Sequence, residues 1–67
     1  MQKGAILSAN VLNTIKLVAR GKALKGAAAD LGVSIHTVNH RLMRAKKLVG
    51  ADTIPHLIYI LTKEGSI

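Results

Sequence analysis

Hydrophobic side chains recur at helical spacing in four segments of the chain, and turn-forming or helix-capping residues separate these segments. Glycines stand where a helix can close and hydroxyl residues stand where one can open: Gly21, Gly32, Gly50, Ser8, Ser34 and Thr53. The pattern predicts an all-α protein with a single domain over residues 1–67. Its four helices are expected at about 8–19, 24–31, 35–49 and 53–63.

The first two predicted helices support the rest of the domain. The core side of the first is expected to consist of Leu12, Ile15, Val11 and Val18. Its outward side is expected to carry Asn13, Lys16 and Arg20. The second helix is rich in alanine, and Gly26 within it either marks a tight contact or weakens the helix by roughly 1 kcal/mol relative to alanine. Gly32 and Ser34 after it can form the turn of a helix-turn-helix, the glycine by closing one helix and the serine by capping the next.

The predicted third helix has the clearest division into an apolar and a polar side. At 100° per residue its apolar residues fall within about 60° of one another, and they are Val38, Leu42, Ala45 and Val49. The opposite side carries His36, His40, Met43 and Lys47, flanked by Asn39, Arg44 and Thr37. Amide, imidazole, hydroxyl and cationic groups on one helix face suit the major groove of DNA, where such groups read base edges.

The predicted fourth helix carries more apolar side chains than one core stripe requires. The stripe consists of Ile54, Leu57, Ile58 and Leu61, and Pro55 is tolerated in the first turn. The residues expected off the stripe are His56, Tyr59, Ile60 and Lys63. An apolar surplus on a terminal helix often marks a second subunit, so we expect these four residues to form a homodimer interface. A plain core helix is the alternative.

The charge of the chain indicates what kind of partner it binds. Ten Lys or Arg residues against three Asp or Glu residues leave a net charge of +7, and nine of the ten cations lie within residues 1–51. A cationic surface of this kind points to a polyanion, above all a nucleic acid. Tyr59 is the one aromatic residue, which argues against stacking on unpaired bases and favours a duplex.

Composition also excludes several kinds of site. Cysteine is absent, which excludes disulfides and thiol chemistry and indicates a reducing, cytoplasmic location. The longest apolar run, 57–61, cannot span a bilayer, so no membrane partner is expected. No nucleophile elbow or phosphate loop occurs, so neither catalytic residues nor a cofactor are expected. His36 and His40 have metal-ligand spacing but no third ligand nearby in the sequence, and we expect no metal site.

Several segments, in this order and at these spacings, resemble the LuxR/GerE family of bacterial helix-turn-helix regulators. They are Leu7–Ser8, Ile15–Lys22, Ala28–Ser34 and Ser34–His40, followed by a basic run to Gly50. The resemblance extends from Leu7 to about Ile60. The chain departs from the family's pattern at Val11, Gly26, Ala27, Arg41, Leu48 and Val49. Taken as a complete protein, the chain resembles the stand-alone members, which are controlled by their abundance.

The resemblance implies a four-helix domain whose third helix enters the major groove of double-stranded DNA and whose fourth helix forms a homodimer. It implies base contacts by Asn39, His40 and Met43, and the helix periodicity adds His36. Phosphate contacts are expected from Lys22, Lys25, Ser34, Thr37, Arg41, Arg44 and Lys47. The expected function is that of a small, nucleoid-associated transcription regulator.

Three other interpretations remain open at this point. The helix-turn-helix could be a protein-interaction module that acts on RNA polymerase, a sigma factor or another regulator. The chain could be a membrane-active cationic peptide, which would need an amphipathic surface helix in place of a packed bundle. The cations of the third helix could be a solvated face. Independently of that choice, Met43 could be a core residue and not a contact for a thymine methyl group.

Overall fold

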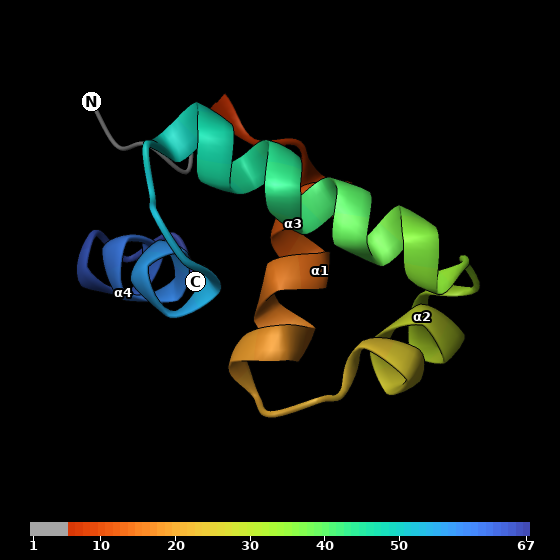
Figure 1. Cartoon of the computed structure of the whole chain (residues 1–67). Coiled ribbons are helices and arrows are strands. Elements are labelled where there is room, and N and C mark those ends of the chain that lie inside the picture. Colours follow the sequence, from red (N-terminus) through yellow and green to blue (C-terminus); the bar gives the residue numbers. More distant parts are fainter. Residues whose placement is uncertain (1–5) are drawn as a thin grey trace.

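The computed structural model describes residues 6–67 and shows, in that part of the chain, four helices and no strand. They are α1 (Ala9–Ala19), α2 (Leu24–Leu31), α3 (Ile35–Val49) and α4 (Ile54–Lys63) (Figure 1). The prediction of an all-α fold is confirmed for these residues, and residues 1–5 of the predicted domain lie outside them. No helix in 6–67 combines the length and the apolar character that crossing a membrane requires.

Side-chain caps set where three of the helices begin. Ser8 and Thr53 have extended backbones, and their hydroxyl groups accept hydrogen bonds from the backbone N–H groups of Val11 (3.3 Å) and His56 (3.1 Å). The first and fourth helices therefore begin one residue later than predicted, because a cap residue lies just outside the helix. Ser34 caps α3 in the same way, which confirms the prediction for that residue.

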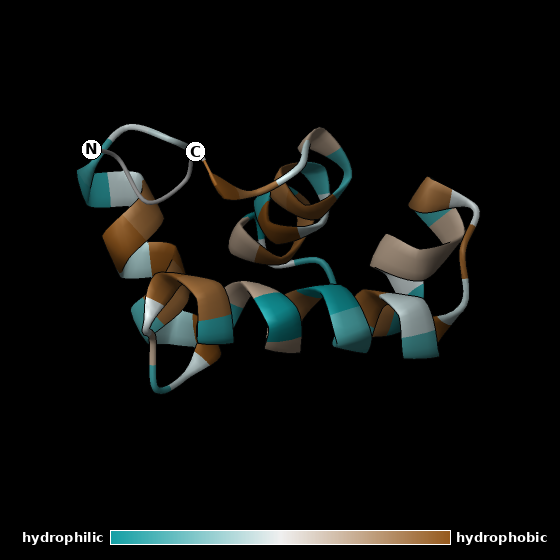
Figure 2. Ribbon diagram, turned by 90° about the horizontal axis from the view of Figure 1, so that it is seen from above, coloured by the Kyte–Doolittle hydropathy of each residue, from teal (hydrophilic) through white to brown (hydrophobic). Residues whose placement is uncertain are grey.

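The helix α3 is the element to which the other three attach. It packs against α1, α2 and α4, and α1 also packs against α2. Figures 1 and 2 both place α1, α2 and α4 on the same side of α3. One long side of α3 is therefore left uncovered by the rest of the domain.

The core confirms the predicted apolar stripe of α3. Val38, Leu42, Ala45 and Val49 are all buried. The other helices and the segment before α1 contribute the remaining buried apolar side chains: Leu7, Ile15, Ala27, Ala28, Leu57 and Leu61. In α1 the prediction was less accurate, because Val11, Leu12 and Val18 are only partly buried at the edge of this core.

A buried hydroxyl group occupies a core position of α1 that the sequence did not mark. Thr14 is fully buried, and its hydroxyl donates a hydrogen bond to the carbonyl oxygen of Asn10 at 2.8 Å. The hydroxyl oxygen of Thr14 in turn accepts a bond from the Arg41 guanidinium, whose Nη1 lies 3.3 Å away. Both bonds satisfy a polar group that would otherwise be costly to bury.

Two glycines of the α2 region behave differently. Gly32 closes α2 with a left-handed backbone (φ 68°), as the predicted turn requires. Gly26 lies inside α2, and a Cβ atom placed there would meet only the Lys22 side chain, at 3.5 Å from its Cδ and 4.0 Å from its Nζ. Because these are ordinary van der Waals distances, the interpretation of Gly26 as the mark of a tight contact is wrong.

Candidate nucleic-acid interface

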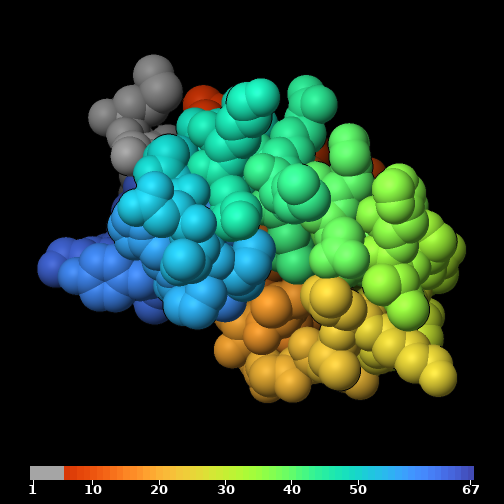
Figure 3. All heavy atoms as spheres, viewed as in Figure 1, coloured from red at the N-terminus to blue at the C-terminus, as the bar shows by residue number. Residues whose placement is uncertain are grey.

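The uncovered side of α3 carries a continuous set of exposed side chains, which we call the forward face. It consists of His36, Asn39, His40, Met43, Arg44 and Lys47, all of them exposed. In Figure 3 the side chains of α3 stand out as a band across the molecule. The four residues predicted to contact bases therefore lie together on one accessible surface.

Met43 is the most informative member of the forward face. Its side chain is 65% exposed, so it is not a core residue. It borders a shallow hollow together with His40, Arg44 and Lys47. An exposed thioether among imidazole and cationic groups has no role in the packing of this domain, and it offers an apolar contact to a partner that docks there.

The forward face is cationic without internal compensation. No acidic residue occurs between Asp30 and Asp52. Among the described residues, neither Arg44 nor Lys47 forms an ion pair or a side-chain hydrogen bond. Their charges are therefore available to phosphate groups.

Hydroxyl groups cluster at the start of α3. Ser34 Oγ accepts a hydrogen bond from the Thr37 backbone N–H at 3.1 Å and lies 3.0 Å from Thr37 Oγ1. Ser34 is exposed and Thr37 is half-buried. The two predicted phosphate contacts thus lie side by side at the positive end of the α3 dipole, where an anion is favoured.

The two predicted phosphate contacts near α2 are not equivalent. Lys22 Nζ lies 3.1 Å from a carboxylate oxygen of Asp30, and both side chains are about half exposed, at 47% and 44%. Lys25 is exposed and has no ionic partner among the described residues. Lys25 can therefore bind a phosphate directly, whereas Lys22 must first give up its ion pair with Asp30. A surface ion pair is weak enough for that exchange.

Arg41 stands apart from the other predicted phosphate contacts. It is half-buried, and its guanidinium donates to the hydroxyl of Thr14 on α1. This bond joins two helices whose residues are 27 positions apart. Sequence reasoning missed the pairing because no local pattern links the two positions.

The four predicted dimer residues of α4 divide into three exposed residues and one core neighbour. His56, Tyr59 and Lys63 are exposed and fall on one stripe of the helix. Lys63 Nζ lies 3.4 Å from the Tyr59 hydroxyl and 5.7 Å from the centre of its ring. Ile60 is half-buried and packs against the core, so its expected outward position is wrong. The predicted core stripe of α4 was too narrow, because the helix packs Ile60 as well against the core.

His56 also stabilises the start of α4, a role that sequence reasoning missed. Its Nδ1 accepts a hydrogen bond from the Asp52 backbone N–H at 3.2 Å, while its own backbone N–H donates to Thr53 Oγ1. A hydroxyl residue followed three positions later by a side-chain acceptor is the pattern of a capping box, but here the acceptor bonds the residue before the Thr53 cap and not Thr53 itself. His56 therefore closes the start of α4.

The three histidines do not gather with other ligands. Within residues 6–67 no group of three or more His, Asp or Glu side chains lies close enough to hold a metal ion. His36 and His40 are side chains of the forward face, and His56 is used at the start of α4.

Comparison of the chain with protein-family models, with curated proteins and with solved structures finds no match. What remains to indicate a function is the chemistry of the forward face and its flanks, together with the resemblance described above. The resemblance extends beyond α3, but it assigns the base contacts to the helix that carries the forward face.

Proposed function

We propose that the protein binds double-stranded DNA with sequence preference, as a small transcription regulator of the LuxR/GerE helix-turn-helix type, and that α3 enters the major groove. The supporting observation is that the forward face is exposed and cationic while the other three helices pack on the opposite side of α3. An α-helix fits the width of the major groove, and the polar groups of this face match the donors and acceptors presented there.

Base reading is assigned to the four residues at the centre of the forward face. The Asn39 amide can form a bidentate pair with adenine, and the exposed Met43 thioether can contact a thymine methyl group. His36 and His40 each present an imidazole one helical turn apart and can bond to base edges. A good bidentate base contact discriminates against the wrong base by about 1–3 kcal/mol.

Backbone binding is assigned to cations and hydroxyl groups around this centre. Lys25, Arg44 and Lys47 have no ionic partner within residues 6–67 and would neutralise phosphates, with Ser34 and Thr37 contributing hydroxyl groups at the start of α3. Lys22 and Arg41 would contribute the N–H groups that do not take part in their bonds to Asp30 and Thr14. These contacts fix the position of the helix and supply most of the affinity through release of counterions.

A homodimer through α4 completes the proposal. The exposed stripe of His56, Tyr59 and Lys63 offers an aromatic ring between polar groups, a composition typical of subunit contacts. Two copies related by a twofold axis would place two forward faces in successive major grooves, with half-sites about ten base pairs apart. The protein would then act on the nucleoid in the cytoplasm.

Binding to duplex DNA at varied salt tests this assignment. Replacing Lys47 with Gln should weaken binding to all sequences and reduce the slope of log K against log [salt] by about 0.9, the contribution of one phosphate contact. Arg20→Gln removes the same charge from an exposed site on α1 and is the matched control. Equal slopes for both variants, or no duplex binding at low salt, would contradict the proposal.

A further inference from the structure

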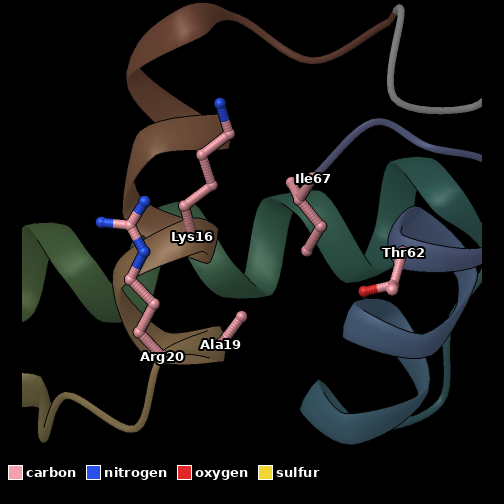
Figure 4. A pocket seen from close by; sticks show the side chains of 5 residues that line it. All are labelled: Lys16, Ala19, Arg20, Thr62 and Ile67. Carbon is pink, nitrogen blue, oxygen red and sulfur yellow. The ribbon is translucent and has the colours of Figure 1, made fainter.

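A second cationic surface lies between α1 and α4, away from the forward face. It is a hollow of about 310 Å³ lined by Lys16, Ala19, Arg20, Thr62 and Ile67 (Figure 4). The methyl group of Ala19 and the side chain of Ile67 give it an apolar part, and Lys16 and Arg20 form one of its edges. None of these residues takes part in the proposed DNA contact.

The hollow opens on the side of the domain opposite the forward face. Thr14 marks the side of α1 that meets α3, through its bond with Arg41. At 100° per residue, Lys16 lies about 160° around the helix from Thr14. Figure 4 agrees, because it shows α1 and α4 in front of α3. A duplex on the forward face would leave this hollow accessible.

Lys16 and Arg20 are like charges that form no ion pair within the described residues. They stand one helical turn apart, a spacing at which like charges repel. No ion pair joins either of them to the three acids of the chain, Asp30, Asp52 and Glu64. An anion bound between them would relieve the repulsion.

A second hollow lies on the other side of these cations, between α1 and α2, and is lined by Asn13, Lys16, Leu17, Arg20, Asp30 and Leu31. The Asp30 carboxylate repels any anion there, so we expect the anionic groups of a partner on the α4 side of Lys16 and Arg20. A nucleic-acid backbone has no aliphatic side chain that could fill the apolar part of the first hollow. A peptide with carboxylates next to an aliphatic side chain complements both the cations and the apolar part of that hollow.

We propose that Lys16, Arg20 and the hollow beside them are a docking surface for an acidic segment of a protein partner. Two carboxylates of the segment pair with Lys16 and Arg20, and a neighbouring aliphatic side chain packs against Ala19 and Ile67. Since the surface is opposite the forward face, the partner and a duplex can be bound at the same time. The docking surface does not depend on whether the protein binds DNA.

Titration of the isotope-labelled full chain with a short synthetic peptide of glutamate and leucine, at low salt, tests the proposal. The expected result is a set of amide shift changes at Lys16, Ala19, Arg20, Thr62 and Ile67. A peptide with glutamine in place of every glutamate should produce none. The Lys16→Gln, Arg20→Gln double variant should bind the acidic peptide about fivefold to tenfold more weakly, as expected for two exposed ion pairs.

A Lys25→Gln, Lys47→Gln double variant removes the same charge elsewhere and should bind the peptide unchanged. Ala19→Glu, which adds a carboxylate inside the hollow, should also weaken binding and covers the case in which the first double variant fails to fold. Shift changes confined to the forward face would overturn the proposal, because the peptide would then act as a mimic of DNA. So would the absence of binding, or shifts at the hollow on titration with duplex DNA. Failure of duplex binding alone would leave the peptide result intact.

Discussion

The guanidinium of Arg41 on α3 donates a hydrogen bond to the hydroxyl of Thr14 on α1, over 3.3 Å. Thr14 is fully buried, and its hydroxyl donates a hydrogen bond to the carbonyl oxygen of Asn10. The forward face is thus held in its orientation by a polar link as well as by the apolar core. A rotation of α3 about its axis would break that link and would also turn the forward face.

Replacement of Thr14 by Val tests this link. Valine keeps the shape of threonine but removes the hydroxyl, so both hydrogen bonds are lost and an Arg41 donor loses its acceptor. We expect the free energy of unfolding to fall by about 1 kcal/mol, the usual net value of a hydrogen bond. Urea unfolding of Thr14→Val and of the exposed control Asn13→Ala measures the difference. A Thr14→Val variant as stable as the control would show that the link does not stabilise the fold.

Gly26 and Gly32 should respond in opposite directions to replacement by alanine. Gly26 has an ordinary helical environment with room for a Cβ atom, so Gly26→Ala should stabilise the protein by about 0.5–1 kcal/mol. Gly32 has a positive φ, and Gly32→Ala should destabilise by roughly 1–2 kcal/mol. In a domain of this size 1 kcal/mol moves the midpoint of thermal unfolding by about 4–8 °C. A lower midpoint for Gly26→Ala would contradict the conclusion that there is room for a Cβ atom at this position.

The hydrogen bond from the Asp52 backbone N–H to His56 Nδ1 predicts a difference between two His56 variants. His56→Ala leaves the Asp52 N–H without its acceptor and should destabilise by about 1 kcal/mol. His56→Asn supplies a side-chain oxygen that can accept the same bond. We therefore expect the asparagine variant to retain most of the stability in thermal unfolding. Equal losses in both variants would mean that the imidazole stabilises α4 in another way.

Tyr59 is the residue on which the proposed dimer depends most. It is 60% exposed at the centre of the α4 stripe, so Tyr59→Glu should leave the fold intact and place a charge in the interface. Sedimentation should then show the unaltered chain as a dimer and the variant as a monomer, at concentrations where circular dichroism is the same for both. A monomeric unaltered chain, or a variant that still dimerises, would exclude this interface.

The sequence predicted the parts of the molecule that obey a local periodicity. The stripe of Val38, Leu42, Ala45 and Val49 was correct in full because every member follows from the helical repeat. The forward face was then determined as the opposite side of the same helix. Its exposure followed once the other helices were known to pack on one side of α3.

Features that depend on distant residues could not be predicted in this way. The burial of Thr14 needs a donor that lies 27 positions later in the chain. Ile60 was placed outward because the width of the buried side of α4 is set by α3 and the core and not by its own pattern. The ion pair of Lys22 with Asp30 similarly depends on how the turn before α2 folds back.

Selection from a pool of random duplexes by the unaltered chain shows whether the forward face reads DNA sequence. We expect an enriched site with two similar half-sites whose centres lie about ten base pairs apart. We also expect Asn39→Ala to select the same site with relaxed preference at one base pair of each half-site, where about 1–3 kcal/mol of discrimination is lost. No enriched site at low salt, or an identical site for Asn39→Ala, would contradict the assignment of the forward face to DNA.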